Sequence, residues 1–340
     1  MLPQFGVSAV VTQWQFAPIV TGVVVVLAGL YGWGVIRVAR RHPARPWPRW
    51  RTAFFGAGLL VIVVATQSGI GVYDDLLFYD HMVQHLMLLM VAPPLLIAGQ
   101  PLTLLLHASR NPLHTWTKRA IRSRVASFLT WPVFGAALYA LGVMAAHLTG
   151  IANLVERNQT AHNAEHALFV IIGYLFVLPI LGTEPIRWRL SYPVRFVLLV
   201  LLMPIDTFTG IALGYGSATS PGVPTGPRPA WAPSPVSDLH TGGAVMWVGG
   251  DAIMFGLMMI VFLMWARDER ATVSGRSFFE RARRENLAAL VASAGPATVE
   301  AGDSGAAPAA GGRGGIDDDE HLAAYNAYLA RLNRQHEPGG

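Results

Sequence analysis

The chain has 340 residues, of which 53% are hydrophobic and only 13% are charged, a balance that indicates a membrane protein. The net charge is +5, but the basic residues lie between apolar runs, so the charge predicts membrane topology and no nucleic-acid partner. The absence of cysteine excludes disulfides, thiolate metal sites and iron–sulfur clusters.

Seven apolar runs are long enough to cross a bilayer core of roughly 30 Å, which needs about 20 helical residues. They are residues 17–38, 52–70, 81–106, 131–149, 162–181, 194–213 and 242–265. The sequence therefore predicts an all-α, polytopic membrane protein with a seven-transmembrane-helix bundle over residues 17–266. The first run is too long for a signal peptide and precedes arginines, so we expect it to remain as a membrane anchor.

The third run contains three prolines, Pro93, Pro94 and Pro101. Proline lacks a backbone donor and clashes with the preceding turn, so we expect a kinked or broken helix. Irregular backbone at membrane depth is tolerated only where protein surrounds it. The third helix is therefore predicted to lie inside the bundle.

Orientation follows from the basic residues, because cytoplasmic loops carry an excess of lysine and arginine. Four connecting segments hold twenty of the 25 basic residues, and the opposite segments hold only Arg157 and Arg228. The four segments are residues 37–51, 109–124, 183–195 and 267–284. This partition places the amino terminus outside, with residues 1–16 as an outer segment, and the carboxyl terminus in the cytoplasm.

Two regions outside the bundle have a biased composition. The outer segment 215–238 is rich in proline, glycine and serine and is predicted to be extended and irregular. Residues 267–340 read as a cytoplasmic and largely flexible tail. Within this tail, apolar residues at helical spacing predict a short amphipathic helix near residues 317–335.

Six histidines fall at the outer ends of the predicted helices. They are His81, His85, His147, His162, His166 and His240. Two pairs, His81 with His85 and His162 with His166, have the four-residue spacing that places both rings on one helix face. Met82 and Met246 lie close to these histidines in sequence.

Imidazole and thioether ligands suit copper, and imidazole also suits zinc and haem iron. We therefore predict a metal site built from His81, His85, His162, His166 and His240. His147, Met82 and Met246 are further candidate ligands. The simpler alternative is that each histidine is an interfacial residue without a ligand.

Acidic and amide side chains near these histidines have two predicted roles. Asp80, Gln84 and Glu165 are placed to orient the rings by hydrogen bonds. Asp206 and Asp251 lie within predicted spans, where a carboxylate is costly and therefore a functional candidate. These two acids could serve a helix–helix contact, a role near the metal or a proton relay.

Four segments together resemble one protein family. They read HMVQHLMLLMVAPPLLIAGQPLTLLL from His81, HNAEHALFVIIGYLFVLPILG from His162, PIDTFTGIALG from Pro204 and DLHTGGAVMWVGGD from Asp238. Over residues 72–267 the chain resembles the multi-span CtaG family of cytochrome c oxidase assembly factors. In this resemblance, the histidine motifs of the family correspond to His81, His85, His162, His166 and His240.

The resemblance implies a protein of the bacterial plasma membrane that helps to assemble haem–copper oxidases. It further implies that copper is supplied to the oxidase subunit that carries the dinuclear copper centre. We expect no enzyme, because an activated nucleophile, a phosphate-binding loop and a hydride-cofactor motif are all missing from the sequence. Two alternatives stay open: a copper or proton transporter using Asp206 and Asp251, and a haem-binding membrane protein with axial histidines such as His85 and His166.

Overall fold

The computed structural model of the protein describes residues 2–221, 223 and 226–294, and the described residues form helices and no strand. The chain divides into two compact units, residues 1–275 and 276–340, and the helix bundle belongs to the first. The amphipathic helix predicted near residues 317–335 lies outside the described residues.

Six helical segments in the described part of the chain are long and apolar enough to cross a membrane. They are α2 (Pro18–Arg41), α3 with α4 (Arg49–Gln67 and Gly69–Tyr73), the broken segment Phe78–Ala108, α12 (Gln159–Leu181), α13 (Tyr192–Gly214) and residues Pro235–Arg270 of α14 (Pro235–Ala294). A shorter apolar helix, α10 (Pro132–Leu148), coincides with the fourth predicted span. The prediction of an all-helical membrane protein is therefore confirmed, while the count of seven spans stays a prediction.

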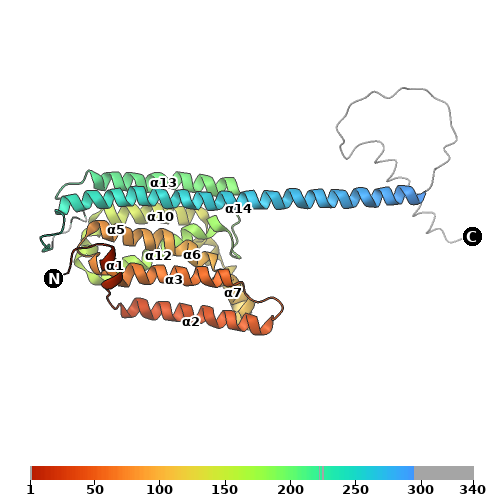
Figure 1. Ribbon diagram of the computed structural model, residues 1–340, viewed down its shortest axis with the longest axis horizontal. Helices are drawn as coiled ribbons and strands as arrows, with labels where there is room; N and C mark the ends of the chain where they lie inside the picture. The colour runs from red at the N-terminus through yellow and green to blue at the C-terminus, as the bar shows by residue number, and fades with distance from the viewer. Residues whose placement is uncertain (1, 222, 224–225, 295–340) are drawn as a thin grey trace, which may run out of the picture. The chain divides into compact units, whose positions relative to one another are not determined.

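Short helices connect the long ones. α1 (Val7–Thr12) precedes α2, and α11 (Gly150–Arg157) joins α10 to α12. α8 (Leu113–Ile121) and α9 (Arg124–Leu129) lie between the broken segment and α10. The long helices run alongside one another in the first unit, and α14 continues as a helix well beyond the predicted end of the last span at residue 265 (Figure 1).

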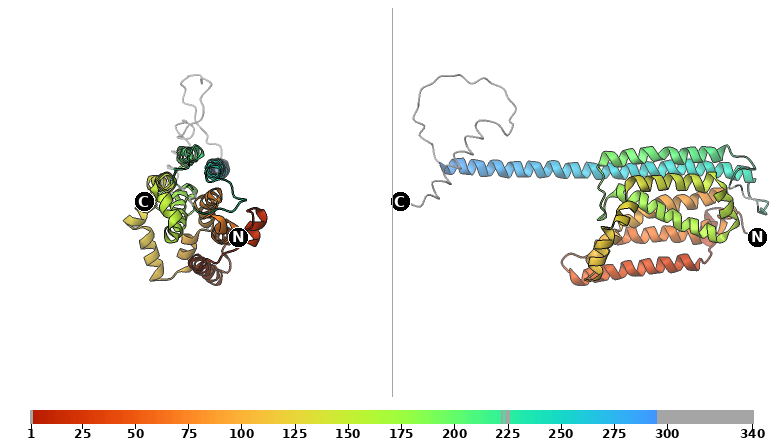
Figure 2. Two further views of the ribbon diagram at one scale, coloured as in Figure 1. Left: turned by 90° about the vertical axis from the view of Figure 1, so that its left-hand side faces the viewer. Right: turned by 180° about the vertical axis from the view of Figure 1, so that it is seen from behind.

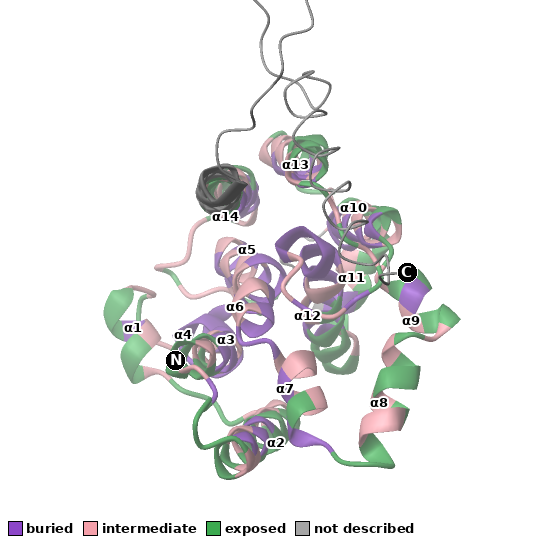
Figure 3. Cartoon of the chain, turned by 90° about the vertical axis from the view of Figure 1, so that its right-hand side faces the viewer, coloured by how far each residue is buried: buried purple, intermediate pink, exposed green. Residues whose placement is uncertain are grey.

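The buried centre of the bundle lies between α2 on one edge and α13 with α14 on the other (Figure 2). α3 packs on α6 (Ala92–Ala98), α12 packs on α6 and α10, and α10 also packs on α13. Buried residues concentrate on these central helices, whereas α2 and α8 are largely exposed (Figure 3). Large side chains such as Tyr139, Phe169 and Leu88 are fully buried there and form the hydrophobic core.

The third predicted span is broken, as the prolines indicated. It consists of α5 (Phe78–Leu86), the π-helical turn η1 (Met87–Val91), α6 and α7 (Pro101–Ala108). The break falls at Gln100, whose backbone is left-handed with φ 53° and ψ 55°. Glu184 from the α12–α13 connection accepts hydrogen bonds from the N–H groups of Leu102 and Thr103, both at 3.0 Å, so its carboxyl group caps the start of α7. The prediction of a broken third helix is confirmed.

Gly173 allows α12 to lie directly against the π-helical turn. A β-carbon at this position would lie 1.9 Å from the carbonyl oxygen of Leu89 and 2.8 Å from the ring of Pro93. Only glycine permits so close an approach of two backbones. This contact holds the histidine-bearing start of α12 close to α5.

Candidate metal centre

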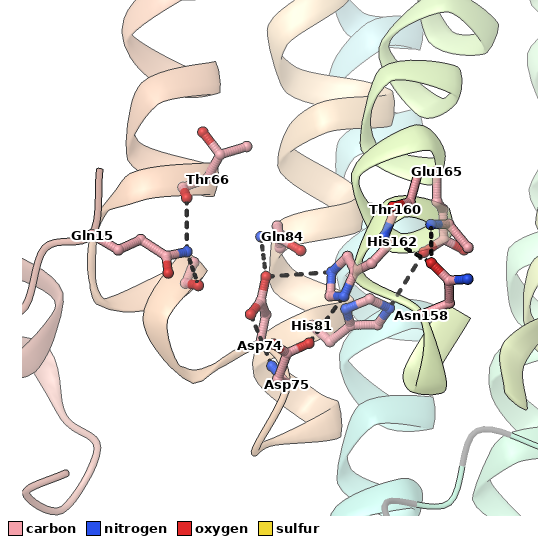
Figure 4. Close-up of polar contacts among 12 residues, drawn as sticks. Gln15, Thr66, Asp74, Asp75, His81, Gln84, Asn158, Thr160, His162 and Glu165 are labelled. Atoms are coloured by element: carbon pink, nitrogen blue, oxygen red, sulfur yellow. Dashed lines mark hydrogen bonds and ion pairs between the residues drawn. The ribbon is translucent and has the colours of Figure 1, made fainter. Parts of the chain in front are cut away.

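Five histidines from three helices converge at one end of the bundle, and we call them the histidine cluster: His81, His85, His147, His162 and His166. His81 and His85 on α5 meet His162 and His166 on α12. Figure 4 shows His81 and His162 facing each other between these helices. The ring centroids lie 5.1 Å apart for His81 and His162, and 6.4 Å apart for His85 and His166. The two i,i+4 pairs therefore meet across a helix–helix interface.

The starts of α5 and α12 are fixed by side-chain hydrogen bonds. Asp238, fully buried at the start of α14, accepts the N–H groups of Phe78 and Tyr79, both at 3.0 Å. Arg228 from the outer segment forms an ion pair with Asp238. Asn158 accepts two N–H groups in the first turn of α12. Because unpaired N–H groups at a helix start favour such acceptors, these contacts determine where the histidines lie.

A chain of hydrogen bonds fixes the proton positions on two histidines. The Nδ1 of His147 lies 2.8 Å from the carbonyl oxygen of Val143, so this nitrogen must donate a proton. In neutral His147 the Nε2 is then an acceptor, and the Nδ1 of His85, 3.1 Å away, donates to it. The Nε2 of neutral His85 consequently carries a lone pair.

That lone pair faces a carboxylate. The Nε2 of His85 lies 3.3 Å from the Oε2 of Glu165, and both atoms are buried without a hydrogen-bond partner in the part of the chain that the structure describes. Two acceptors at this separation repel each other unless a positive charge lies between or beside them. Either an added proton or a metal ion would satisfy both atoms, so the donor set fits a bound cation.

His162 has a similar arrangement. Its Nδ1 lies 3.0 Å from Asp75 and its Nε2 lies 3.5 Å from Asp74, a carboxylate that Gln84 also contacts at 2.6 Å (Figure 4). The hydrogen bond from His162 lowers the pKa of Asp75, whereas burial raises the pKa of Asp74. Because Asp75 holds the Nδ1 proton, a metal ion at His162 would bind at Nε2, which carries a lone pair only when the ring is neutral.

Two sets of ligand atoms lie close enough to hold a metal ion. One comprises His81, His85 and Glu165, and the other comprises Asp74, His81, His162 and His166. Within each set, one ligand atom per residue lies within 4.8 Å of the others. His81 belongs to both sets, so the two positions adjoin and share a ligand.

A small cavity of about 50 Å³ lies beside the ligand atoms. It is lined by His81, His85, His147 and His162, by acidic side chains, and by buried Met82. This volume accommodates a metal ion with one or two waters. The shape of the cavity therefore agrees with the donor set.

Several of the predicted site residues lie outside both ligand sets. His240 is exposed, and its Nε2 donates to the carbonyl oxygen of Gly216 at 2.8 Å. Met246 is buried in the hydrophobic core. Asp80 is buried, and its Oδ2 has no hydrogen-bond partner among the described residues.

Two of the residues predicted to orient histidine rings have different contacts from those expected. Glu165 is a member of a ligand set. The side chain of Gln84 donates a hydrogen bond to Asp74 instead of contacting a ring.

The two intramembrane acids lie on α13 and α14, outside both ligand sets. Asp206 is buried and accepts a hydrogen bond of 2.6 Å from the hydroxyl of Tyr139. Asp251 accepts a hydrogen bond of 3.0 Å from the hydroxyl of Thr207. Each acid therefore accepts a hydrogen bond from a neutral hydroxyl on a neighbouring helix.

Sequence reasoning missed Asp74 and Asp75, which contact His162. Both follow the predicted second span and precede His81 by six or seven residues. The sequence did contain a sign of their role. Two adjacent acids are unusual in a chain with so few charges, and these two lie on the same predicted side as the histidines. Tyr139 was also missed, because an isolated tyrosine in an apolar helix carries no such signal.

Residues 29–268 match the protein family described as cytochrome c oxidase caa3 assembly factor (Caa3_CtaG). Uncharacterised proteins of Mycobacterium bovis and Mycobacterium tuberculosis are each 30% identical over 282 residues, which are 79% of this chain and 42% of each relative. An uncharacterised protein of Mycobacterium leprae is 30% identical over 271 residues, 77% of this chain and 41% of the relative. The chain thus spans less than half the length of these curated relatives. No solved structure matches the chain.

Proposed function

Because the chain belongs to the cytochrome c oxidase caa3 assembly factor family, we propose that it binds copper as cargo for a haem–copper oxidase. In this proposal the protein lies in the bacterial plasma membrane and acts through contact with the oxidase, not as an enzyme. The partner is the oxidase subunit that carries the dinuclear copper centre. The histidine cluster, with Glu165 and Asp74, is the copper site.

The proposed topology has seven spans, with α10 as the fourth. At 1.5 Å per residue its 17 residues extend about 26 Å, which is close to the thickness of a bilayer core. An odd number of spans also agrees with the distribution of twenty basic residues on one side against two on the other. This topology places the amino terminus and the histidine cluster on the outer side.

One observation carries the proposal: the buried pair of facing acceptors, His85 Nε2 and Glu165 Oε2, 3.3 Å apart. This pair needs either a proton or a metal ion between its atoms, and the adjoining cavity and the neighbouring ligand His81 favour a metal ion. A further histidine–carboxylate approach, 3.5 Å between His162 Nε2 and Asp74 Oδ2, lies in the other ligand set, which shares His81.

The donor atoms are compatible with copper in either oxidation state. Imidazole with carboxylate suits Cu(II), and imidazole with the thioether of Met82 suits Cu(I). Zinc would accept the same imidazole and carboxylate ligands, so the choice of copper rests on the family. Two adjoining ligand sets that share His81 also suit a cargo that must be released, because an ion can move between them one ligand at a time.

Two other functions have less support from the geometry. A haem with axial His85 and His166 needs a pocket of several hundred Å³, compared with about 50 Å³ beside the cluster. A transporter would use Asp206 and Asp251, but each of these acids has a hydroxyl donor from the protein. A Soret band, or an ion flux in proteoliposomes abolished by Asp251→Asn and unaffected by His85→Ala, would support these alternatives.

The proposal is tested by metal analysis of the purified full chain after exposure to copper and gel filtration. We expect about one copper per wild-type chain, a loss with His85→Ala and no change with His240→Ala, an exposed histidine outside both ligand sets. In parallel, cells without the gene should produce an oxidase with less copper, and wild type should restore it better than His85→Ala. Equal copper content in His85→Ala and wild type, or a fully loaded oxidase in the deletion strain, would overturn the proposal.

A further inference from the structure

A second cavity, of about 590 Å³, lies between α8 and the segment that joins α12 to α13. Its walls combine two kinds of side chain. Lys118, Arg122 and Arg187 supply positive charge, and Leu106, Ile121 and Ile186 supply apolar surface. A site with grouped cations beside an apolar wall suits a ligand that has an anionic head and a hydrocarbon body.

The positive charge in this cavity is uncompensated. Its lining contains no acidic residue, and within the described part of the chain Lys118, Arg122 and Arg187 form no ion pair with a carboxylate. Arg187 donates one hydrogen bond, 3.4 Å to the hydroxyl of Ser127, which leaves further guanidinium donors for an anion. Three cations around one cavity therefore attract an anionic group.

The walls of the cavity are held together by hydrogen bonds between distant segments. Trp188 donates to the carbonyl oxygen of Ser127 at 2.6 Å, which ties the α12–α13 connection to α9. The Nδ1 of His114 donates to the carbonyl oxygen of Leu106 at 3.0 Å, which ties α8 to the end of α7. The cavity is thus formed before any ligand arrives, so little conformational entropy is lost on binding.

The position of α8 indicates that the ligand comes from the bilayer. α8 borders the bundle and has no buried residue (Figure 3). Its exposed side chains include Leu113 and Trp116 beside the cations Lys118 and Arg119. An exposed helix with apolar, tryptophan and basic residues is typical of one that lies at the interface of a membrane.

We propose that this cavity binds an anionic phospholipid, with the phosphate between Lys118, Arg122 and Arg187 and an acyl chain along Leu106, Ile121 and Ile186. A zwitterionic lipid is disfavoured, because its ammonium group would approach three cations with no acid to accept it. Free phosphate would leave the apolar wall uncovered. This site is separate from the histidine cluster, so it does not depend on copper binding.

The test uses the delipidated full chain in detergent, with phosphatidylglycerol, phosphatidylcholine and inorganic phosphate as probes. Binding is followed by native mass spectrometry and by the melting temperature. We expect phosphatidylglycerol to remain bound and to raise the melting temperature, and the other two probes to do neither. Equal binding of phosphatidylcholine, or binding of inorganic phosphate at the same concentration, would overturn the proposal.

A pair of triple variants with the same charge change decides whether the cavity is responsible. Lys118→Gln/Arg122→Gln/Arg187→Gln removes the lining cations, whereas Arg110→Gln/Arg119→Gln/Arg124→Gln removes three that do not line the cavity. We expect the first to weaken phosphatidylglycerol binding by about tenfold or more and the second by less than about twofold. Equal weakening would mean diffuse attraction and no site. If the first variant does not fold, Arg187→Gln alone against Arg119→Gln gives the same comparison.

Discussion

The Nε2 of His85 and the Oε2 of Glu165 lie 3.3 Å apart in the buried centre of the histidine cluster, and no described residue donates a hydrogen bond to either atom. His85 donates its single ring proton to His147, and His147 donates its own to the carbonyl oxygen of Val143. Neutral His85 therefore has no proton left on Nε2. Two facing acceptors are unfavourable unless a cation, either a proton or a metal ion, lies between them.

Glu165→Gln should separate metal affinity from stability. The new amide can donate to His85 Nε2, so the melting temperature of the metal-free protein should be unchanged or higher. Copper affinity should fall by about tenfold or more, because the carboxylate ligand is lost. A competition titration with a copper chelator and a melting curve measure the two effects. Asp251→Asn is the matched control, and an equal loss of affinity in that variant would contradict the assignment.

Glu184 should make stability depend on pH at the opposite end of the bundle. Burial raises the pKa of this carboxyl in the folded state above its unfolded value of about 4.3. The contribution of Glu184 to stability is therefore present at low pH and is lost as pH rises through the folded pKa. We expect the melting temperature of Glu184→Gln, relative to wild type, to rise between about pH 4 and pH 7. A difference that stays constant or reverses over this window would contradict the prediction.

Gly173→Ala should disturb the fold and the metal site together. The added methyl would lie 1.9 Å from the carbonyl oxygen of Leu89, so α12 must move away from η1. Overpacking of this kind costs about 1–3 kcal/mol, and the displaced start of α12 should also weaken copper binding. Gly256→Ala has open space around the new methyl and should be neutral or slightly stabilising. If the two alanine variants melt at the same temperature, the close approach is not essential.

The ion pair of Arg228 and Asp238 should show coupling in a double-mutant cycle. Asp238→Asn alone leaves a largely buried guanidinium without its carboxylate and weakens the cap on α5. We expect a loss of about 2–4 kcal/mol for this variant, and part of that loss should be recovered when Arg228→Gln is added. Chemical or thermal unfolding of the three variants measures the coupling. Strictly additive effects would show that the two residues act independently.

Sequence reasoning was most successful where the physics is local. The spacing of His81 and His85, and of His162 and His166, depends only on helix geometry, and each pair indeed shares a face of its helix. The prolines of the third span predicted its break for an equally local reason. The π-helical turn η1 was not predicted, because nothing in its sequence distinguishes it from an ordinary apolar helix.

What sequence could not provide is the packing of helices that are distant along the chain. His240 was grouped with the other histidines because it lies on the same side, yet its ring contacts Gly216. Asp74 contacts His162 across nearly ninety residues of sequence. Which helices adjoin is decided by long-range contacts such as that between Gly173 and Leu89, and one sequence does not reveal these contacts.

The central claim is most directly tested by copper K-edge X-ray absorption on the loaded full chain. The account predicts coordination by nitrogen and oxygen with scattering from at least two imidazole rings, and a changed spectrum with lower occupancy in His85→Ala. A sulfur contribution from Met82 would be compatible with Cu(I). Bound copper without imidazole scattering, or a spectrum and occupancy identical in His85→Ala, would contradict the claim that the histidine cluster is the copper site.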